Sequence, residues 1–454
     1  MLKELLLPEI EDLIEQNQWE DISEILSLWQ EAETADLITS IKKNEDKINI
    51  FKTLPKEYSI KVFPELVSID QEHIIESMTD DEKKELLENI NPDDRTSFLE
   101  SIDEDMSKNI LKLLGSEDRE IASLLLSYPE GSIGRMMTPE YISIKPDWTV
   151  EGAFEYVRSN IEDAETYTTI YVLDNKRTLI GSIALRQLFF SGQKMLIGDI
   201  VNNCPYILAY EDKENAIEII KKYNLHSLAV IDNKHSMVGI VTVDDILDIA
   251  EEEYTEDFHK MAGITSDDNQ FDDNLKITPI FTMYKKRILW LLALVFVNLF
   301  SGGVISIFQN TLQKHIVLVA FLPLLIGSGG NAGSQSATLV IRSLAIGDVV
   351  LKDWVYLLSK EVLVSSILGL SMALGVSILG VIRGGFEIAV IVSISMFSIV
   401  FIGSIIGLTL PFILTKCKLD PAISGAPVLT SICDIAGAGI YCSIATIVFY
   451  ILAK

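Results

Sequence analysis

Residues 323–335 read PLLIGSGGNAGSQ, and they lie inside a hydrophobic stretch that is long enough to cross a bilayer. A helix that faces lipid is built from large apolar side chains, but this run contains Pro323, four glycines and the amides Asn331 and Gln335. Backbone opened by proline and glycine at membrane depth is tolerated only where protein or water covers it. The run is therefore predicted to line a path for an ion or a solute.

A second polar group lies in the last hydrophobic stretch, where residues 420–437 read DPAISGAPVLTSICDIAG. A carboxylate such as that of Asp434 is unfavourable at bilayer depth and must face a partner or water. No Lys or Arg lies between Asp420 and Lys454 to neutralise it. A mobile cation is the partner that we expect, and a protonated Asp434 bonded to a neighbouring helix is the alternative.

Five hydrophobic stretches are predicted to cross the membrane and to position these groups, because each is near or above the roughly 20 residues that a spanning helix needs. The cluster Lys285-Lys286-Arg287 precedes the first stretch and is expected in the cytosol. The cytosolic side then holds eight basic residues against three outside, and the C-terminus is extracytoplasmic. The stretches are about 286–308, 316–342, 355–382, 387–414 and 422–452.

The net charge of −28 is unevenly distributed along the chain. Residues 284–454 carry eleven basic and six acidic residues, which leaves 26 basic and 59 acidic residues in 1–283. No nucleic acid is expected as a partner of the acidic half, because phosphate contacts need clustered bases. Divalent cations are expected instead, and a solvated acidic surface is the alternative.

The first 283 residues are expected in the cytosol, because they contain no spanning stretch and their start, MLKELLLPEIED, is interrupted by Pro8 and acids, unlike a signal peptide. The four cysteines form no C-x-x-C pair and have no His cluster beside them, so neither a disulfide framework nor a zinc site is predicted. An enzyme is not predicted either, since no nucleophile–base pair, P-loop or H-E-x-x-H motif is visible.

Residues 1–130 are predicted to be helical throughout, with Leu and Ile at three- and four-residue intervals. A weak repeat of about twelve residues predicts short helices stacked in series. Its copies are 77–90, 89–102 and 101–114. Each copy opens on a helix cap, namely Thr79 with Glu82, Asn91 with Pro92, and Asp103.

Residues 131–253 contain a tandem β-β-α repeat, in which YVLDNKRTLIGSIALRQL matches AVIDNKHSMVGIVTVDDIL. The predicted strands are 169–174, 179–185, 227–232 and 237–243. The segment resembles a pair of CBS domains, and MMTPEY (136–141) and GIVTVDD (239–245) are typical of that family. Such pairs are regulatory modules that bind nucleotides or ions.

In nucleotide-binding CBS repeats, a Ser or Thr and an Asp three residues later contact the ribose and phosphate. The second repeat has this pair as Thr242 and Asp245, but the first has Ala184 and Gln187 instead. The resemblance therefore leaves binding of ATP open.

Residues 244–262 are predicted to form an acidic amphipathic helix, followed by a polar linker that contains Asp267, Asp268, Asp272 and Asp273. Like charges four residues apart destabilise a helix slightly, so this helix favours a counter-cation. A solvated, charged connection is the alternative.

The order of these segments, together with GGNAGSQ in the second span and the DPA…P…D pattern in the fifth, resembles the MgtE family of magnesium channels over essentially the full chain. The predicted fold is thus a multidomain membrane protein. Its parts are an all-α superhelical N-domain (1–130), an α/β tandem CBS pair (131–196 and 197–253), an acidic connecting (plug) helix with its linker (244–283), and a five-helix α transmembrane domain (284–454).

The resemblance implies a homodimer in the lipid bilayer, with one pore lined by the second and fifth spans. Asp434 matches the pore aspartate that recognises hydrated Mg²⁺, and Asn331 resembles the other polar pore position. The candidate ion-binding residues are Asp434, Asn331 and Asp420. The residues expected to let helices pack closely are Gly329, Gly330, Gly333 and Pro427.

The resemblance also implies gating, in which intracellular Mg²⁺ bridges acidic residues and holds a closed state. Cations that bind only the compact state favour closure by linkage. Asn224 stands where relatives carry an acid, which departs from the pattern. The matching acids are Glu57, Asp93, Asp94, Asp212, Glu214, Asp245, Asp248, Glu253, Glu256 and Asp257.

The function expected from these features is Mg²⁺ uptake through a Mg²⁺-gated, multi-pass channel in the plasma (inner) membrane, with the N-terminus in the cytosol. Selectivity against Mn²⁺, Co²⁺ and Ca²⁺ is left open. A secondary transporter of divalent cations coupled to Na⁺ or H⁺ is the alternative. A CBS sensor with a membrane anchor is disfavoured, since an anchor needs neither Asp434 nor the glycine-rich run.

Overall fold

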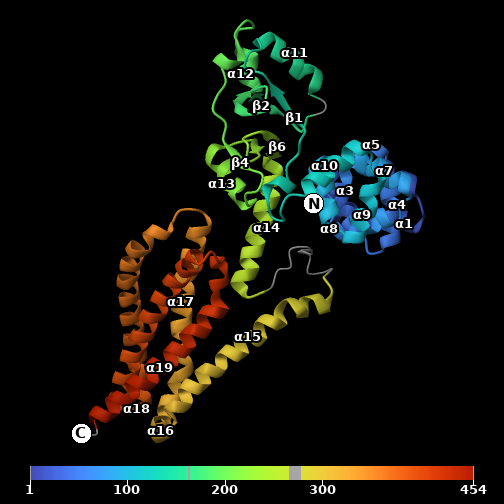
Figure 1. Ribbon diagram of the computed structural model, residues 1–454. Coiled ribbons are helices and arrows are strands. Elements are labelled where there is room, and N and C mark those ends of the chain that lie inside the picture. Colours follow the sequence, from blue (N-terminus) through green and yellow to red (C-terminus); the bar gives the residue numbers. More distant parts are fainter. Residues whose placement is uncertain (1, 162–163, 265–277, 453–454) are drawn as a thin grey trace. The chain divides into compact units, whose positions relative to one another are not determined.

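The computed structural model describes residues 2–161, 164–264 and 278–452 of the 454-residue chain. They form two compact units, Met1–Glu252 and Glu253–Lys454. Figure 1 colours the first unit from blue to green and the second from yellow-green to red. The linker residues Asp267, Asp268, Asp272 and Asp273 lie outside the described residues.

The first unit begins with short helices, which confirms the all-α N-domain predicted from the spacing of Leu and Ile. Helices α7, α8 and α9 coincide with the three copies of the repeat. Thr79 and Glu82 form the expected capping box of α7, and the Asp103 side chain caps α9. Asn91, by contrast, makes no capping hydrogen bond before α8. The helices are α1 (Leu2–Glu15), α2 (Trp19–Leu26), α3 (Glu31–Ser40), α4 (Asn44–Thr53), α5 (Lys56–Val62), α6 (Ser68–Glu76), α7 (Asp80–Asn89), α8 (Pro92–Ser101), α9 (Glu104–Leu113) and α10 (Ser116–Leu126).

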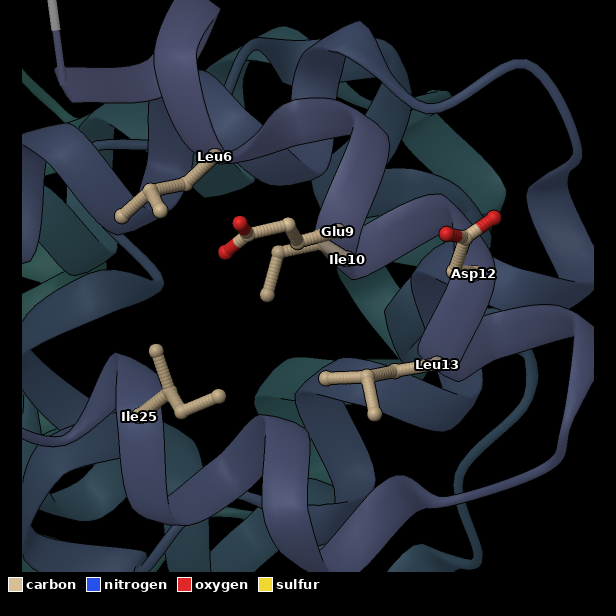
Figure 2. A pocket seen from close by; sticks show the side chains of 6 residues that line it. All are labelled: Leu6, Glu9, Ile10, Asp12, Leu13 and Ile25. Atoms are coloured by element: carbon tan, nitrogen blue, oxygen red, sulfur yellow. The ribbon is translucent and has the colours of Figure 1, made fainter.

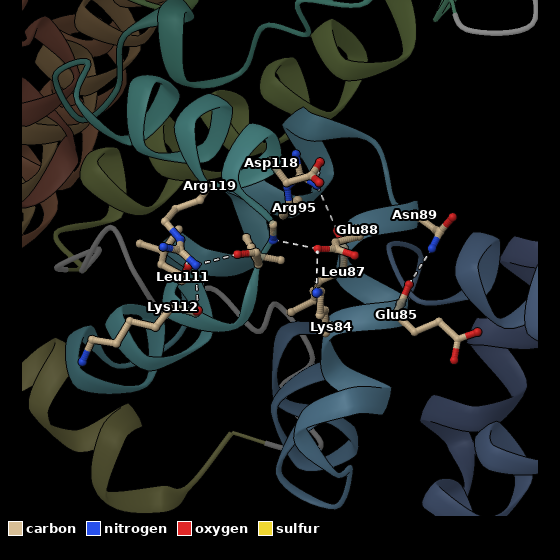
Figure 3. Close-up of polar contacts among 12 residues, drawn as sticks. Lys84, Glu85, Leu87, Glu88, Asn89, Arg95, Leu111, Lys112, Asp118 and Arg119 are labelled. Carbon is tan, nitrogen blue, oxygen red and sulfur yellow. Dashed lines mark hydrogen bonds and ion pairs between the residues drawn. The ribbon is translucent and has the colours of Figure 1, made fainter.

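A buried arginine ties α7, α8 and α10 together (Figure 3). The side chain of Arg95 is 1% exposed, and its Nη1 donates to Asp118 Oδ1 at 2.8 Å and to the Leu87 carbonyl at 3.1 Å. Beside it, Glu88 Oε1 accepts a hydrogen bond of 2.6 Å from the backbone N–H of Gly115. A charge is tolerated in a protein interior when it is paired and hydrogen-bonded, so these contacts fix how the short helices stack.

Two three-stranded sheets of identical topology follow, which confirms the tandem repeat. In each sheet the first two strands are parallel and the last two antiparallel. Ile170 lies opposite Ile183 in the first sheet, and Leu228 lies opposite Val241 in the second; all four are fully buried. The elements are η1 (Ile133–Arg135), β1 (Tyr141–Ile144), α11 (Val150–Asn160), β2 (Thr166–Leu173), β3 (Leu179–Ala184), α12 (Leu185–Phe190), η2 (Ile197–Asp199), β4 (Tyr206–Leu208), α13 (Glu214–Tyr223), β5 (Ser227–Ile231) and β6 (Met237–Thr242).

The two repeats share an aspartate that closes the same kind of turn, after β2 in the first repeat and after β5 in the second. Asp174 accepts two backbone hydrogen bonds of 2.8 Å across the first turn, and Asp232 accepts two of the same length across the second. A bridge between Thr178 and Ser236 joins the two turns. Strands β1 and β4 were not predicted, because runs of four and three residues are too short for alternation of apolar and polar residues to show.

The second unit holds four helices, among the described residues, that are long and apolar enough to cross a membrane: Ile280–Ile307, Ile316–Ala345, Leu351–Lys416 and Ala426–Leu452. The acidic helix expected at 244–262 is α14 (Val243–Ala262). The remaining elements are α15 (Ile280–Ile307), α16 (Gln309–Lys314), η3 (Ile316–Phe321), α17 (Leu322–Ala345), η4 (Leu351–Asp353), α18 (Trp354–Lys416), η5 (Pro421–Ser424) and α19 (Ala426–Leu452).

Helix α18 reverses direction at Gly385. Its 63 residues would measure about 95 Å in a straight helix, three times the roughly 30 Å hydrocarbon core. Gly385 has φ 78° and ψ −171°, which a residue with a Cβ rarely adopts. A Cβ on Gly380 would lie 2.5 Å from the Ala389 Cα, and one on Gly369 would lie 3.1 Å from the Phe397 carbonyl oxygen. These contacts pair the two halves side by side and antiparallel.

Glycines bring α17 and the second half of α18 into backbone contact. A Cβ on Gly403 would lie 2.5 Å from the Gly329 carbonyl oxygen, and one on Gly407 would lie 2.1 Å from the Gly333 carbonyl oxygen. Real Cβ atoms essentially never approach so closely, so the two helices can pack this way only with glycine at these positions. Small residues at helix contacts are the usual means of close packing in membranes.

We expect Gly407→Ala to destabilise the membrane unit by about 1–3 kcal/mol, because the added methyl group forces the helices apart. Gly375→Ala is the matched control on the same helix, since no described atom beyond its chain neighbours and the backbone of its own helix lies within 4 Å of its Cβ position. Thermal unfolding of the purified protein followed by size-exclusion chromatography measures both variants. Equal midpoints for the two variants would contradict the close contact.

Candidate ion pathway and acidic cluster

Helix α17 has a polar face that no other described segment of the chain covers. Asn331, Gln335, Thr338 and Arg342 are exposed and recur at intervals of three or four residues, which places them on one side of the helix. The predicted packing residues Gly329, Gly330 and Gly333 are buried on the other sides. Asn331 and Gln335 are thus the polar groups of the glycine-rich run that lie on the uncovered face.

Helix α19 packs along α17 in the opposite direction. A Cβ on Gly330 would lie 3.0 Å from the Thr430 side chain, one on Gly333 would lie 2.7 Å from the Leu429 side chain, and Gly437 lies near Ile326. The two helices are therefore antiparallel. This arrangement brings the segment around Asn331 level with the segment that precedes Asp434.

Asp434 is half-buried in α19 and has no ion-pair or hydrogen-bond partner within the described part of the chain. Its chain neighbour Cys433 is buried against α17. A carboxylate at this depth without a protein partner requires water or a cation. The alternative of an Asp434 hydrogen-bonded to a neighbouring helix therefore has no partner in the described residues of a single chain.

Pro427 lies in the first turn of α19, and its carbonyl oxygen accepts hydrogen bonds from two hydroxyl groups. Thr430 donates to it at 3.1 Å and Ser431 at 3.0 Å. Proline lacks an N–H, so it opens the first turn of the helix without leaving a donor unsatisfied.

Asp420 lies apart from Asp434, at the start of the short helix η5. Its Oδ1 accepts a 2.8 Å hydrogen bond from the Ala422 backbone, and its Oδ2 accepts one of 2.8 Å from Lys260 Nζ at the end of α14. Burial lowers the pKa of Lys260, but the hydrogen bonds to Asp420 and Glu256 outweigh it and raise the pKa overall. Asp420 is thus bound to a lysine in this structure.

The end of α14 packs directly on the membrane helices of its unit. The Gly425 Cβ position lies 2.1 Å from the Met261 carbonyl oxygen, and the Gly263 Cβ position lies 2.1 Å from the Trp290 indole nitrogen on α15. The Met261 side chain packs against a cluster formed by α17, η5 and α19, whose buried members are Ala337, Ile341, Ala422, Leu429 and Cys433. Burial and the Asp420 carboxylate raise the pKa of the neighbouring Asp257 to about 6.

A separate cluster of carboxylates lies in the first unit, where α8 faces the start of α14. Burial and the Asp245 carboxylate raise the pKa of Asp94 to about 7, and they raise the pKa of Asp93 well above its usual range. Burial also raises the pKa of Asp245, against two hydrogen bonds from Thr242 that lower it. Burial and the acidic neighbours of Asp248 raise the pKa of its carboxyl group. Four of the predicted sensor acids thus lie together and repel one another.

Family models match most of the chain. The model described as divalent cation transporter matches residues 322–444, the MgtE intracellular N domain matches 29–131, and the CBS domain matches 133–191 and 197–252. The magnesium transporter MgtE of Thermus thermophilus is 33% identical over 335 residues, which are 73% of this chain and 73% of that protein. The chain belongs to the MgtE family.

Further MgtE relatives agree with this assignment. The magnesium transporter MgtE of Bacillus subtilis is 32% identical over 74% of both chains. Among solved structures, the cytosolic domain of the Mg²⁺ channel MgtE in complex with ATP is 27% identical with a TM-score of 0.51, and it covers 54% of this chain and 100% of that one. The soluble part of a magnesium transporter is 25% identical with a TM-score of 0.50, covering 55% and 99%. The long apolar helices and the MgtE family mark an integral membrane protein.

Two further acids of this cluster, Glu165 and Glu65, were not predicted from the sequence of this MgtE chain. Burial and the Asp245 carboxylate raise the pKa of Glu165 to about 7, and burial and Asp248 raise that of Glu65. Glu165 also accepts a 2.8 Å hydrogen bond from Asn91, the residue expected to cap α8. Both glutamates lie outside regular elements in an acidic background, so no periodicity singles them out.

The remaining sensor candidates of the MgtE chain lie elsewhere. Glu57 is exposed on α5, and Asp212 accepts a 3.0 Å hydrogen bond from the backbone of Glu214 as α13 begins. Glu253 belongs to the second unit with Glu256 and Asp257. Asn224 adopts a left-handed conformation (φ 50°, ψ 53°) just after α13, which asparagine tolerates better than most residues.

The pair expected to contact a nucleotide is hydrogen-bonded internally. Thr242 Oγ1 donates to Asp245 Oδ2 at 2.6 Å. In the first repeat Gln187 donates to the Ile200 carbonyl at 2.9 Å and accepts from Asn202 at 2.8 Å. Gln187, which stands where the pattern has aspartate, is therefore hydrogen-bonded to residues at the start of the second repeat.

A small apolar pocket of about 280 Å³ lies in the N-domain, between α1 and α2 (Figure 2). The apolar side chains that line it are Leu6, Ile10, Leu13 and Ile25. Glu9 and Asp12 are on its lining as well. An apolar lining of this kind does not suit a metal ion, so we assign it no part in the ion pathway.

Proposed function

We propose that this chain is a Mg²⁺-selective channel that mediates Mg²⁺ uptake and that closes when intracellular Mg²⁺ binds its cytosolic part. The observation that carries the proposal is the half-buried Asp434, which has no partner among the described residues and directly follows a segment of α19 that is level with the uncovered polar face of α17. Both features are unfavourable in lipid, and both are suited to a hydrated cation. Membership of the MgtE family supports Mg²⁺ as the cation.

The polar face of α17 favours a homodimer. Asn331 and Gln335 are exposed at membrane depth in a single chain, and lipid does not satisfy amide groups. A second copy related by a two-fold axis would cover this face and place two Asp434 carboxylates around one path. Mg²⁺ releases its water reluctantly and prefers six oxygen ligands, so paired carboxylates and amides would hold it through its water shell.

The membrane topology that we propose has five crossings, because α18 is a pair of antiparallel halves that meet at Gly385. The cytosolic side then carries Lys285, Lys286 and Arg287 before the first crossing. In this topology the protein lies in the plasma membrane, with its N-terminal unit on the cytosolic side and its C-terminus on the extracytoplasmic side.

The proposed gating rests on the cluster of carboxylates in the first unit. The cluster of Asp93, Asp94, Glu165, Asp245 and Asp248 is strained by mutual repulsion, and a divalent cation would relieve it. Among the described residues no three His, Cys, Asp or Glu side chains lie close enough to ligate one metal ion directly. The cluster therefore suits a cation held through its waters, and cation binding to this compact arrangement would stabilise it by linkage.

Flux through liposomes tests the channel against the coupled transporter. We expect purified protein to move Mg²⁺ down its own gradient at an unchanged rate when ionophores collapse the Na⁺ and H⁺ gradients, with the membrane potential clamped. Liposomes with the Asp434→Ala variant supply the background. Uptake that stops with the Na⁺ or H⁺ gradient would favour the transporter instead.

A further inference from the structure

The first two turns of α15 expose two aromatic rings together with two basic side chains. The rings of Phe281 and Tyr284 are stacked, with centroids 6.1 Å apart and planes inclined by 21°. The Lys285 ammonium group lies over the Phe281 ring, 5.0 Å from its centroid. Arg287 follows Tyr284 by three residues, which places the two side chains next to each other on the helix surface. All four side chains are exposed.

The two basic residues flank the rings on one side of α15. At 3.6 residues per turn, Lys285 and Arg287 are about 160° apart around the helix, and both rings lie within that arc. Helical side chains lean toward the N-terminus, so both cationic groups lean back toward the level of the rings. Lys286 lies on another side of the helix, is partly buried and is not part of this site.

No acidic residue offsets these two charges. Helix α15 contains no Asp or Glu among its 28 residues. Neither Lys285 nor Arg287 forms an ion pair with a described residue of the chain. Near the surface of an anionic membrane, each such charge contributes about 1 kcal/mol of attraction. The site therefore favours a ligand with a net negative charge over a zwitterion.

The same side of α15 continues beyond the basic residues as an exposed apolar surface. No residue of this helix is buried. Leu292, Val295 and Leu299 follow Phe281 at helical spacing, and each side chain is more than half exposed. A ligand that fits both parts has an anionic headgroup beside the basic residues and hydrocarbon along the apolar ones. A soluble anion would use only the first part.

We propose that this side of α15 binds an anionic phospholipid, with its phosphate between Lys285 and Arg287 and its acyl chains along Leu292, Val295 and Leu299. The aromatic rings lie at the level of the headgroup, where amphipathic and aromatic side chains anchor membrane helices. The proposed topology places the site in the cytosolic leaflet. Binding itself requires only that α15 crosses the membrane, and it does not depend on the conduction of Mg²⁺.

Native mass spectrometry of the full-length protein, titrated with phosphatidylglycerol in detergent, tests the site. Lys285→Gln/Arg287→Gln should bind this lipid about 30-fold more weakly than the wild type, the change that corresponds to ~2 kcal/mol for two charges. Lys416→Gln/Lys418→Gln removes two exposed charges at the end of α18 and is the matched control, which should bind as the wild type does. Equal weakening in the two variants would overturn the site, because it would show a general attraction to basic residues.

Two competitors test the chemical class of the ligand. Phosphatidylcholine should bind the wild type and Lys285→Gln/Arg287→Gln equally weakly, because it has no net charge. Glycerol 3-phosphate should not displace phosphatidylglycerol, because it lacks the hydrocarbon that contacts the apolar part of the site. Displacement by glycerol 3-phosphate, or binding of phosphatidylcholine as tight as that of phosphatidylglycerol, would contradict an anionic phospholipid.

Thermal unfolding and light scattering complete the test without reference to conduction. Phosphatidylglycerol should raise the thermal midpoint of the wild type and of Lys416→Gln/Lys418→Gln more than that of Lys285→Gln/Arg287→Gln. If Lys285→Gln/Arg287→Gln instead changes the number of associated chains and leaves lipid binding unchanged, this side of α15 contacts a second copy and the proposal fails. If the wild type carries no Mg²⁺ current but binds lipid as described, the proposed function fails and the lipid site stands.

Discussion

Asp434→Ala is expected to reduce Mg²⁺ uptake by about 100-fold or more, the change that accompanies a loss of ~2.7 kcal/mol in ion binding. The variant removes a half-buried carboxylate that has no partner among the described residues of its own chain. Because an unpaired charge at bilayer depth is unfavourable, its removal should leave the thermal midpoint unchanged or raise it. Uptake measured with a Mg²⁺-sensitive dye in liposomes, beside thermal unfolding, checks both effects.

Glu387→Gln is the matched control for this change. Glu387 is an exposed acid near the reversal of α18 at Gly385, remote in sequence from the proposed path. It should keep wild-type uptake. Normal uptake by Asp434→Ala would remove Asp434 from the path, and a lowered thermal midpoint together with lost uptake would indicate a structural role instead.

Neutralising Asp245, Asp248, Glu253 and Glu256 together is expected to leave the channel open at cytosolic Mg²⁺ concentrations that close the wild type. Asp245 and Asp248 belong to the acidic cluster, and Glu256 belongs to the contact with Lys260. The neutral amides that replace them neither bind a cation nor repel neighbouring carboxylates. Mg²⁺ therefore no longer favours the compact, closed state. The concentration for half closure should rise more than tenfold in patch recordings.

A control with the same loss of charge distinguishes a specific cluster from a general surface effect. Neutralising four exposed acids on α1 and α2 should leave the Mg²⁺ response unchanged, apart from a small change in the long-range field. These acids are Glu11, Glu15, Glu20 and Glu24. Closure of the first variant at the usual concentration would show that the sensor lies elsewhere.

The N-domain and the CBS pair could be predicted from sequence because local patterns determine them. The twelve-residue repeat placed α7, α8 and α9, and Asp174 and Asp232 marked turns that the structure closes with paired backbone hydrogen bonds. The break near Gly385 also lay between two predicted hydrophobic stretches. In each case the signal and the element occupy the same few residues.

The contacts between distant segments could not be predicted in this way. Nothing near Lys260 in the sequence indicates Asp420, and nothing near Asp245 indicates Glu165, since each pairing depends on how separate elements fold together. Asn91 was expected to cap a helix and instead donates to Glu165, because tertiary contact offered its side chain a better acceptor. The pore assignment of Asp434 and Asn331 remains a prediction.

Current through patches excised from liposomes tests the central claim most directly. With a Mg²⁺ gradient and no gradient of Na⁺ or H⁺, the account predicts a current that reverses at the Mg²⁺ equilibrium potential. That current should be absent in Asp434→Ala, and it should fall toward zero as Mg²⁺ rises on the side of the acidic cluster. A wild-type protein that carries no current until a Na⁺ or H⁺ gradient is imposed would contradict the account.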